Sequence, residues 1–203
     1  MTAKGMSFTL ALATLAFSTV AFADDTFQVR YAANLNIGDS VVDFTNSGAT
    51  VINGVSANIC ANLYTFDPAE ELISCCTCSV TPNGLQSLSV MRSLISNPLT
   101  PAVPTSVVIK IVATAGAACN ASTVAPANLA HGLLAWGTAL HQNTSTAAPT
   151  YAVTETAFSE ASLTAAELIH ITSTCGFIQS NGSGFGICKG CAAGGLGAFT
   201  SIQ

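Results

Sequence analysis

The sequence predicts a mainly β fold, an antiparallel β-sandwich (Ig-like) with one short C-terminal helix, stabilised by disulfides. Three observations predict it. Short apolar segments that alternate like strands recur through the first half of the chain, with turn residues between them. One later segment carries helix-capping residues. The chain has 203 residues and eight cysteines, and all of the cysteines follow residue 23.

The first 23 residues are typical of an export signal. Lys4 precedes the apolar run SFTLALATLAFSTV, and Ala21, Phe22 and Ala23 form a site of the kind that a signal peptidase cuts. A retained anchor is disfavoured, because this run is shorter than the ~20 apolar residues that span a bilayer. We expect residues 1–23 to be a signal peptide and residues 24–203 a single secreted β-rich domain, extracellular or at the cell surface, with no membrane span after cleavage.

Two strands are predicted before residue 50. TFQVRYAAN alternates Phe27, Val29 and Tyr31 with polar residues, which is the period of a half-buried strand. DSVVDFTNSG predicts a short strand that ends in turn residues.

Four more strands are predicted over residues 57–116. ANICANLYTFDP gives one, LISCCTCSVTPNGLQSLSV gives two around the turn Pro82-Asn83-Gly84, and SVVIKIVATAG is the clearest buried strand. Strand alternation places Cys76 and Cys78 on one face of their strand and Cys75 on the other.

The middle of the chain allows two interpretations: residues 122–150 could form one short helix and a strand, or two strands. His131 and His141 are expected at the ends of elements, and Trp136 is expected to anchor the core. QNTSTAAPT, at residues 142–150, is predicted to be an exposed loop.

A helix is predicted over residues 162–176. Thr164 and Glu167 form a capping box, and Gly176 can end the helix. Leu168, Ile171 and Cys175 share one face, which would turn Cys175 toward a sheet. After it, FIQSNGSGFGICKGC predicts a hairpin that carries the last two cysteines.

The cysteines predict disulfides, because their number is even and the chain is predicted to be exported. They are Cys60, Cys75, Cys76, Cys78, Cys119, Cys175, Cys188 and Cys191. Zinc is the alternative, bound by Cys76-x-Cys78 and Cys188-x-x-Cys191, but the first spacing is unusual and four cysteines would remain. We expect all eight to be oxidised, with no metal and no cofactor.

The composition and motifs exclude several functions. The predicted mature chain carries four Lys and Arg residues against ten carboxylates, so it has no electrostatic patch for nucleic acid. No motif combines a nucleophile, a base and an orienting group, so we expect no catalytic residues and no enzyme. Asn120, Asn143 and Asn181 begin N-x-S sequences and are possible glycan acceptors.

Most of the cysteines lie in two segments, NICANLYTFDPAEELISCCTCSVTPNGL and CGFIQSNGSGFGICKGC. These segments resemble a family of secreted, cysteine-rich bacterial proteins that is uncharacterised and has no known activity. The resemblance implies export and a common disulfide frame, and it assigns no catalytic residue.

The low charge favours self-assembly, because monomeric β proteins protect their exposed strand edges with charged residues. We expect an extracellular structural subunit that self-assembles into a filament, pilus-like fibre or surface layer, with itself as partner. The alternative is a secreted monomeric binding module for a carbohydrate or surface ligand. In the first case Phe27, Val29 and Tyr31 would form an assembly strand that pairs head-to-tail with a neighbour, unless that strand pairs within its own sheet.

Overall fold

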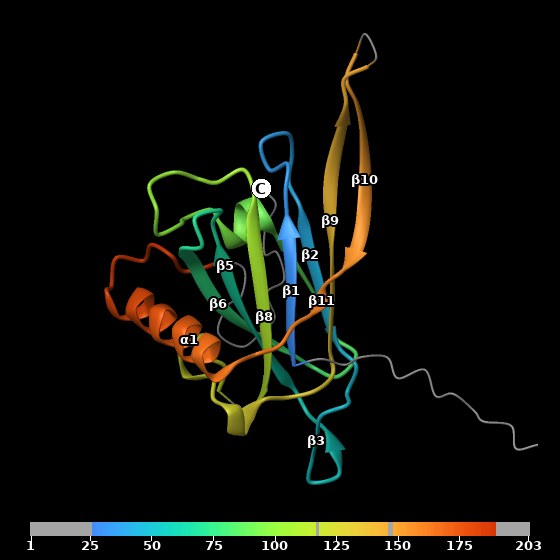
Figure 1. Ribbon diagram of the computed structural model, residues 1–203. Coiled ribbons are helices and arrows are strands. Elements are labelled where there is room, and N and C mark those ends of the chain that lie inside the picture. The colour runs from blue at the N-terminus through green and yellow to red at the C-terminus, as the bar shows by residue number, and fades with distance from the viewer. Residues whose placement is uncertain (1–25, 117, 146–147, 190–203) are drawn as a thin grey trace, which may run out of the picture.

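Two antiparallel sheets pack face to face in the computed structural model, which describes residues 26–116, 118–145 and 148–189 (Figure 1). Sheet A has the order β11-β1-β8-β5-β6. Its strands are β11 (Ser159–Glu160), β1 (Phe27–Ala32), β8 (Val107–Ala115), β5 (Ile59–Phe66) and β6 (Leu72–Val80). Sheet B has the order β10-β9-β2-β7. Its strands are β10 (Thr150–Ala157), β9 (Leu133–Asn143), β2 (Val41–Asn46) and β7 (Leu85–Ser89). The mainly β antiparallel sandwich is as predicted.

The six strands predicted before residue 116 all form. The turn at Asn83 and Gly84 joins β6 to β7, and Asn83 adopts the left-handed backbone conformation, with φ of 60°. A further small hairpin, β3 (Val51–Ile52) and β4 (Val55–Ser56), lies outside both sheets. The predicted signal peptide falls outside the described residues.

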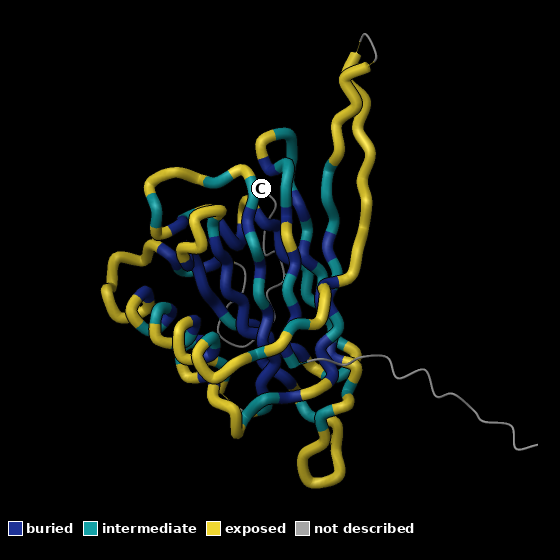
Figure 2. The backbone as a smooth tube through the Cα atoms, in the orientation of Figure 1, coloured by how far each residue is buried: buried dark blue, intermediate teal, exposed yellow. Residues whose placement is uncertain are grey.

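Sheet A is covered on both faces, and every residue of β5 is buried (Figure 2). Alternation along β5 sends Leu63 into the core between the sheets and Tyr64 into a second core beneath α1 (Ala165–Ser180). Leu168 and Ile171 of α1 pack into this second core, as their shared face predicts. The molecule therefore has three layers: sheet B, sheet A and the helix.

Helix α1 starts where predicted but continues past its predicted end. The Thr164 hydroxyl accepts a hydrogen bond from the Glu167 backbone N–H at 3.1 Å. The expectation that Gly176 ends the helix is wrong, because α1 runs on to Ser180. Ile178 in this last turn is buried, so packing against sheet A outweighs the low helix propensity of glycine.

The middle segment forms two strands rather than a helix and a strand. Two short 3-10 turns, η2 (Ala121–Thr123) and η3 (Pro126–Asn128), lead into β9, which pairs with β10 over eight positions. The loop predicted at residues 142–150 is therefore wrong at its ends, which are strand. Trp136 is only half-buried, since inward-facing positions of β9 are taken by Leu133 and Ala135. His131 precedes β9 and His141 lies near its end, and both are exposed.

Among the described residues, no helix is long and apolar enough to cross a membrane. The described part of the segment after α1 does not form the predicted hairpin. It makes one parallel bridge, between Ile187 and Cys75 of β6. The remaining short helix, η1 (Val90–Leu94), follows β7 directly.

Candidate functional site

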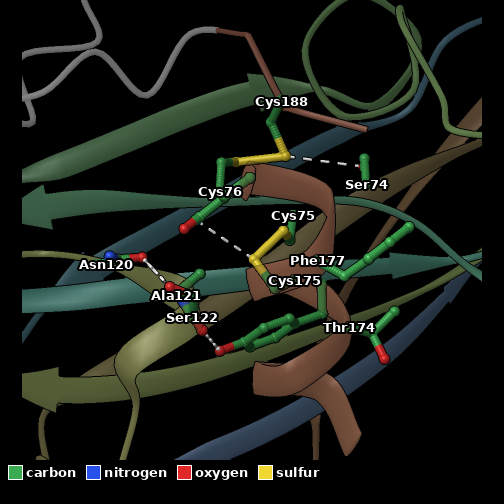
Figure 3. Close-up of a disulfide and its surroundings, with 12 residues drawn as sticks. Ser74, Cys75, Cys76, Asn120, Ala121, Ser122, Thr174, Cys175, Phe177 and Cys188 are labelled. Atoms are coloured by element: carbon green, nitrogen blue, oxygen red, sulfur yellow. Dashed lines mark hydrogen bonds between the residues drawn. A yellow bond between two sulfur atoms is a disulfide. The ribbon is translucent and has the colours of Figure 1, made fainter. Parts of the chain in front are cut away.

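Three disulfides join described cysteines, and all three attach to sheet A. They are Cys60–Cys119, Cys75–Cys175 and Cys76–Cys188, with sequence separations of 59, 100 and 112 residues. Figure 3 shows how the neighbours Cys75 and Cys76 bond in different directions, Cys75 to helix α1 and Cys76 to the C-terminal segment. The two faces predicted for these cysteines explain this, because Cys75 belongs to the core beneath α1 and Cys76 to the core between the sheets.

The remaining cysteines bear on the zinc alternative. Cys76 and Cys188, one from each half of that alternative site, are bonded to each other. Cys78 is also disulfide-bonded, and Cys191 lies outside the described residues. Disulfides persist in oxidising environments, so these bonds indicate an environment of the extracellular type.

The C-terminal segment, residues 184–189, lies along β6 and is called the strap. The Cys75 N–H donates to the Gly186 carbonyl at 2.9 Å, and the Cys188 N–H donates to the Cys75 carbonyl at 3.3 Å. On its other side, the Gly186 N–H donates to the Asn97 carbonyl at 2.8 Å. The strap thus occupies the outer backbone groups of β6 at Cys75, where another strand could otherwise pair.

Sheet B ends very differently, in a projecting hairpin. Beyond the last pairing with β2, at Gly137, strands β9 and β10 continue without a third strand. We call residues 138–145 and 148–155 the arm. Figure 1 shows the arm extending beyond the body, and Figure 2 shows its outer part fully exposed. All eight residues of β10 are exposed, with Tyr151 at 56% and Val153 at 64% of their full accessible surface.

Arg30 anchors the base of the arm. Its side chain is 7% exposed and lies between the sheets, where Nη1 donates to the Thr156 carbonyl at 2.8 Å and also contacts the Thr156 hydroxyl. Gly137 makes room for it, because a Cβ there would lie 2.8 Å from Arg30 Nε. Nε itself has no hydrogen-bond partner among the described residues, and burial lowers the pKa of the guanidinium. Arg30 therefore ties β1 to the foot of β10.

The predicted assembly strand lies inside sheet A. β1 pairs with β8 at six positions and with β11 at two. Phe27 is buried in the core beneath α1, Val29 packs against that core, and Tyr31 is exposed. In this structure the chain's own strands hold β1 on both sides, and the assembly role of these three residues stays a prediction.

A hollow on the surface lies where α1 meets β5 and β8. Its volume is about 310 Å³. The Lys110 ammonium lies 2.5 Å from a Glu167 carboxylate oxygen and 4.3 Å from the centre of the Phe66 ring. The His170 ring stacks on the same phenyl ring, with centroids 6.5 Å apart. Asp67 and Glu70 add two further carboxylates. Among the described residues, no cluster of His, Cys, Asp or Glu has the arrangement of a metal site.

The three possible glycan acceptors share one local geometry. Each asparagine is exposed, and its side-chain oxygen accepts a hydrogen bond from the backbone N–H of the serine two residues later. Asn143 lies near the arm tip, and Asn181 follows α1.

No family model, no curated protein and no solved structure significantly matches the chain.

Proposed function

We propose that the protein is a secreted, non-catalytic structural subunit that self-associates through the arm and assembles outside the cell into a filament, pilus-like fibre or surface layer. One observation carries the proposal: β10 is an exposed strand of eight residues that pairs on one side only among the described residues. The export signal predicted from the sequence and the disulfides support an extracellular location.

The low stability expected of an isolated two-stranded ribbon favours a partner strand for the arm. A two-stranded ribbon is at best marginally stable alone in water, because it has no apolar face to bury. A third strand would satisfy the outer backbone groups of β10 and cover side chains such as Tyr151 and Val153. Monomeric proteins usually protect such an edge with lysine, proline or a bulge. β10 contains none of these residues and only one charge, Glu155.

Shortening the arm tests the proposal. Ala139 and Thr154 form a hydrogen-bonded pair of the β9–β10 ladder, so replacing residues 140–153 with Asn-Gly should close the ribbon with a two-residue turn. We expect the intact mature protein to form oligomers in sedimentation velocity and assemblies in electron microscopy, and the shortened variant to stay folded and monomeric. An intact protein that remains a monomer at high concentration contradicts self-assembly. Equal association of both proteins contradicts assembly through the arm.

A binding module remains the second candidate, because the hollow at Lys110 brings a cation, three carboxylates and an aromatic ring together. This combination suits a polar ligand with an apolar face, such as a sugar. Titration of the protein with monosaccharides, followed by NMR at His170, tests it. Resonance shifts that vanish in Lys110→Met would support a ligand here, and unchanged spectra with every sugar would contradict it.

A glycan on Asn143, near the arm tip, remains a prediction that intact-mass measurement of the native protein tests.

A further inference from the structure

We propose that the partner of the arm is β10 of a second copy, paired antiparallel around a two-fold axis that passes at Val153. This inference depends on the proposed function and names both surfaces of the contact.

The lengths of the other strand edges favour this pairing. β11 has two residues, and β3 and β4 have two each, so none can match eight residues of β10. The strap covers β6 at Cys75. β7 has five residues and leads directly into η1. Among the described strands, the edge that matches β10 in length and projects clear of the body is β10 itself.

The backbone of β10 offers its outer groups at alternate residues. The Phe158 N–H donates to the Ala135 carbonyl at 2.9 Å, which continues the ladder between β9 and β10. Because bonding direction alternates along an antiparallel strand, Tyr151, Val153 and Glu155 direct their N–H and C=O groups away from β9. A second strand centred on Val153 would meet these groups in hydrogen-bonded pairs.

Charge and overlap together select the register, because an axis at Val153 also lies near the centre of the eight residues of β10, whereas an axis at Tyr151 or Ala152 would leave more of the strand unpaired. Opposed residues lie on the same side of a sheet, so a two-fold axis between two identical antiparallel strands brings one residue opposite its own copy. An axis at Glu155 would oppose two carboxylates, and an axis at Thr154 would place them on adjacent diagonal positions. An axis at Val153 pairs Val153 with Val153 and Tyr151 with Glu155, which keeps the carboxylates apart.

A two-fold contact of this kind closes as a dimer. Growth into a fibre then needs a second contact. The β3–β4 hairpin projects at the end of the molecule opposite the arm, with Val51, Ile52 and Val55 exposed on it (Figure 1).

Charge substitutions at Val153 test the two-fold pairing. In V153K or V153E alone, like charges would face each other, and we expect the dissociation constant of the dimer to rise about tenfold or more. Mixing the two variants in equal amounts would bring opposite charges together and should restore association to within a few-fold of the unmodified protein. Because Val153 is 64% exposed, both variants should fold normally. I169K is the matched control, since Ile169 is 67% exposed on α1, away from the arm.

Sedimentation equilibrium of each variant and of the mixture separates the outcomes. If the unmodified protein does not associate, the proposed function fails together with this inference. If it associates and V153K and V153E associate equally well, self-assembly stands but the β10 pair is wrong. If both variants are monomeric and their mixture is too, Val153 faces a different surface, and the two-fold pairing is wrong.

Discussion

Sheet A and the arm are built in opposite ways. The central strand β5 of sheet A is buried along its whole length, the strap bonds to the β6 edge at Cys75, and all three disulfides between described cysteines attach to this sheet. The arm contains no cysteine, and its outer strand is exposed along its whole length. The disulfides and the buried cores therefore stabilise the part of the molecule that needs no partner strand. A partner strand would cover more exposed surface at the arm than at sheet A.

The largest difference between the two regions should appear when a disulfide is removed. The Cys75–Cys175 bond closes a loop of 100 residues, so the variant Cys75→Ala/Cys175→Ala should lose about 3–5 kcal/mol of unfolding free energy. Val153→Lys in the arm should change the monomer's stability by less than about 0.5 kcal/mol. Urea unfolding at a concentration where the protein is monomeric measures both. Similar losses in the two variants would remove the contrast.

Replacing two glycines with alanine should change the free energy of unfolding in opposite directions. Gly137→Ala would bring a Cβ to 2.8 Å from Arg30 Nε and 2.9 Å from the Val41 carbonyl, so we expect a loss of about 1–3 kcal/mol. Gly176→Ala in α1 would meet only the Ser122 Cβ, at 3.6 Å, and should gain about 0.5–1 kcal/mol. Thermal unfolding of the two variants checks the signs. An unchanged unfolding temperature in Gly137→Ala would mean that Arg30 does not fix the base of the arm.

Tyr64, in the core beneath α1, should make the stability of the protein depend on pH. Its hydroxyl donates to the Ala121 carbonyl at 2.6 Å, and burial raises the pKa of Tyr64 well above its ordinary value. The unfolded chain ionises near pH 10 while the folded chain keeps this proton, so this contribution to stability is full below about pH 10 and falls as the pH rises further.

We expect Tyr64→Phe to lose about 1–2 kcal/mol at neutral pH and also to lose this alkaline decline. Urea unfolding at about pH 8 and about pH 11 compares the two proteins. The same alkaline decline in both proteins would assign it to other groups.

The strands of the first half could be predicted because each has its own alternation or apolar run, bounded by turn residues. Cys75 and Cys76 were assigned to opposite faces for the same local reason. The sequence prediction for the end of α1 is wrong, since Gly176 is a stop signal only when packing does not continue the helix, and buried Ile178 continues it here.

The arm was harder to predict than these strands, because the polar residues 142–150 between its two strands are typical of a loop. YAVTETA has strand alternation, with Tyr151, Val153 and Glu155 on one side, and this signal was available. The hollow at Lys110 was out of reach, since Phe66, Lys110 and Glu167 come from three separate elements that only the fold brings together.

Hydrogen exchange along β10 tests the central claim most directly. The amides of Ala152 and Thr154 bond to β9 in the β9–β10 ladder, so in the monomer they should exchange more slowly than those of Tyr151, Val153 and Glu155, which face away from β9. On raising the protein concentration into the range where oligomers form, we predict slower exchange at Tyr151, Val153 and Glu155. Unchanged fast exchange at these three amides in a protein that has associated would contradict assembly through the arm.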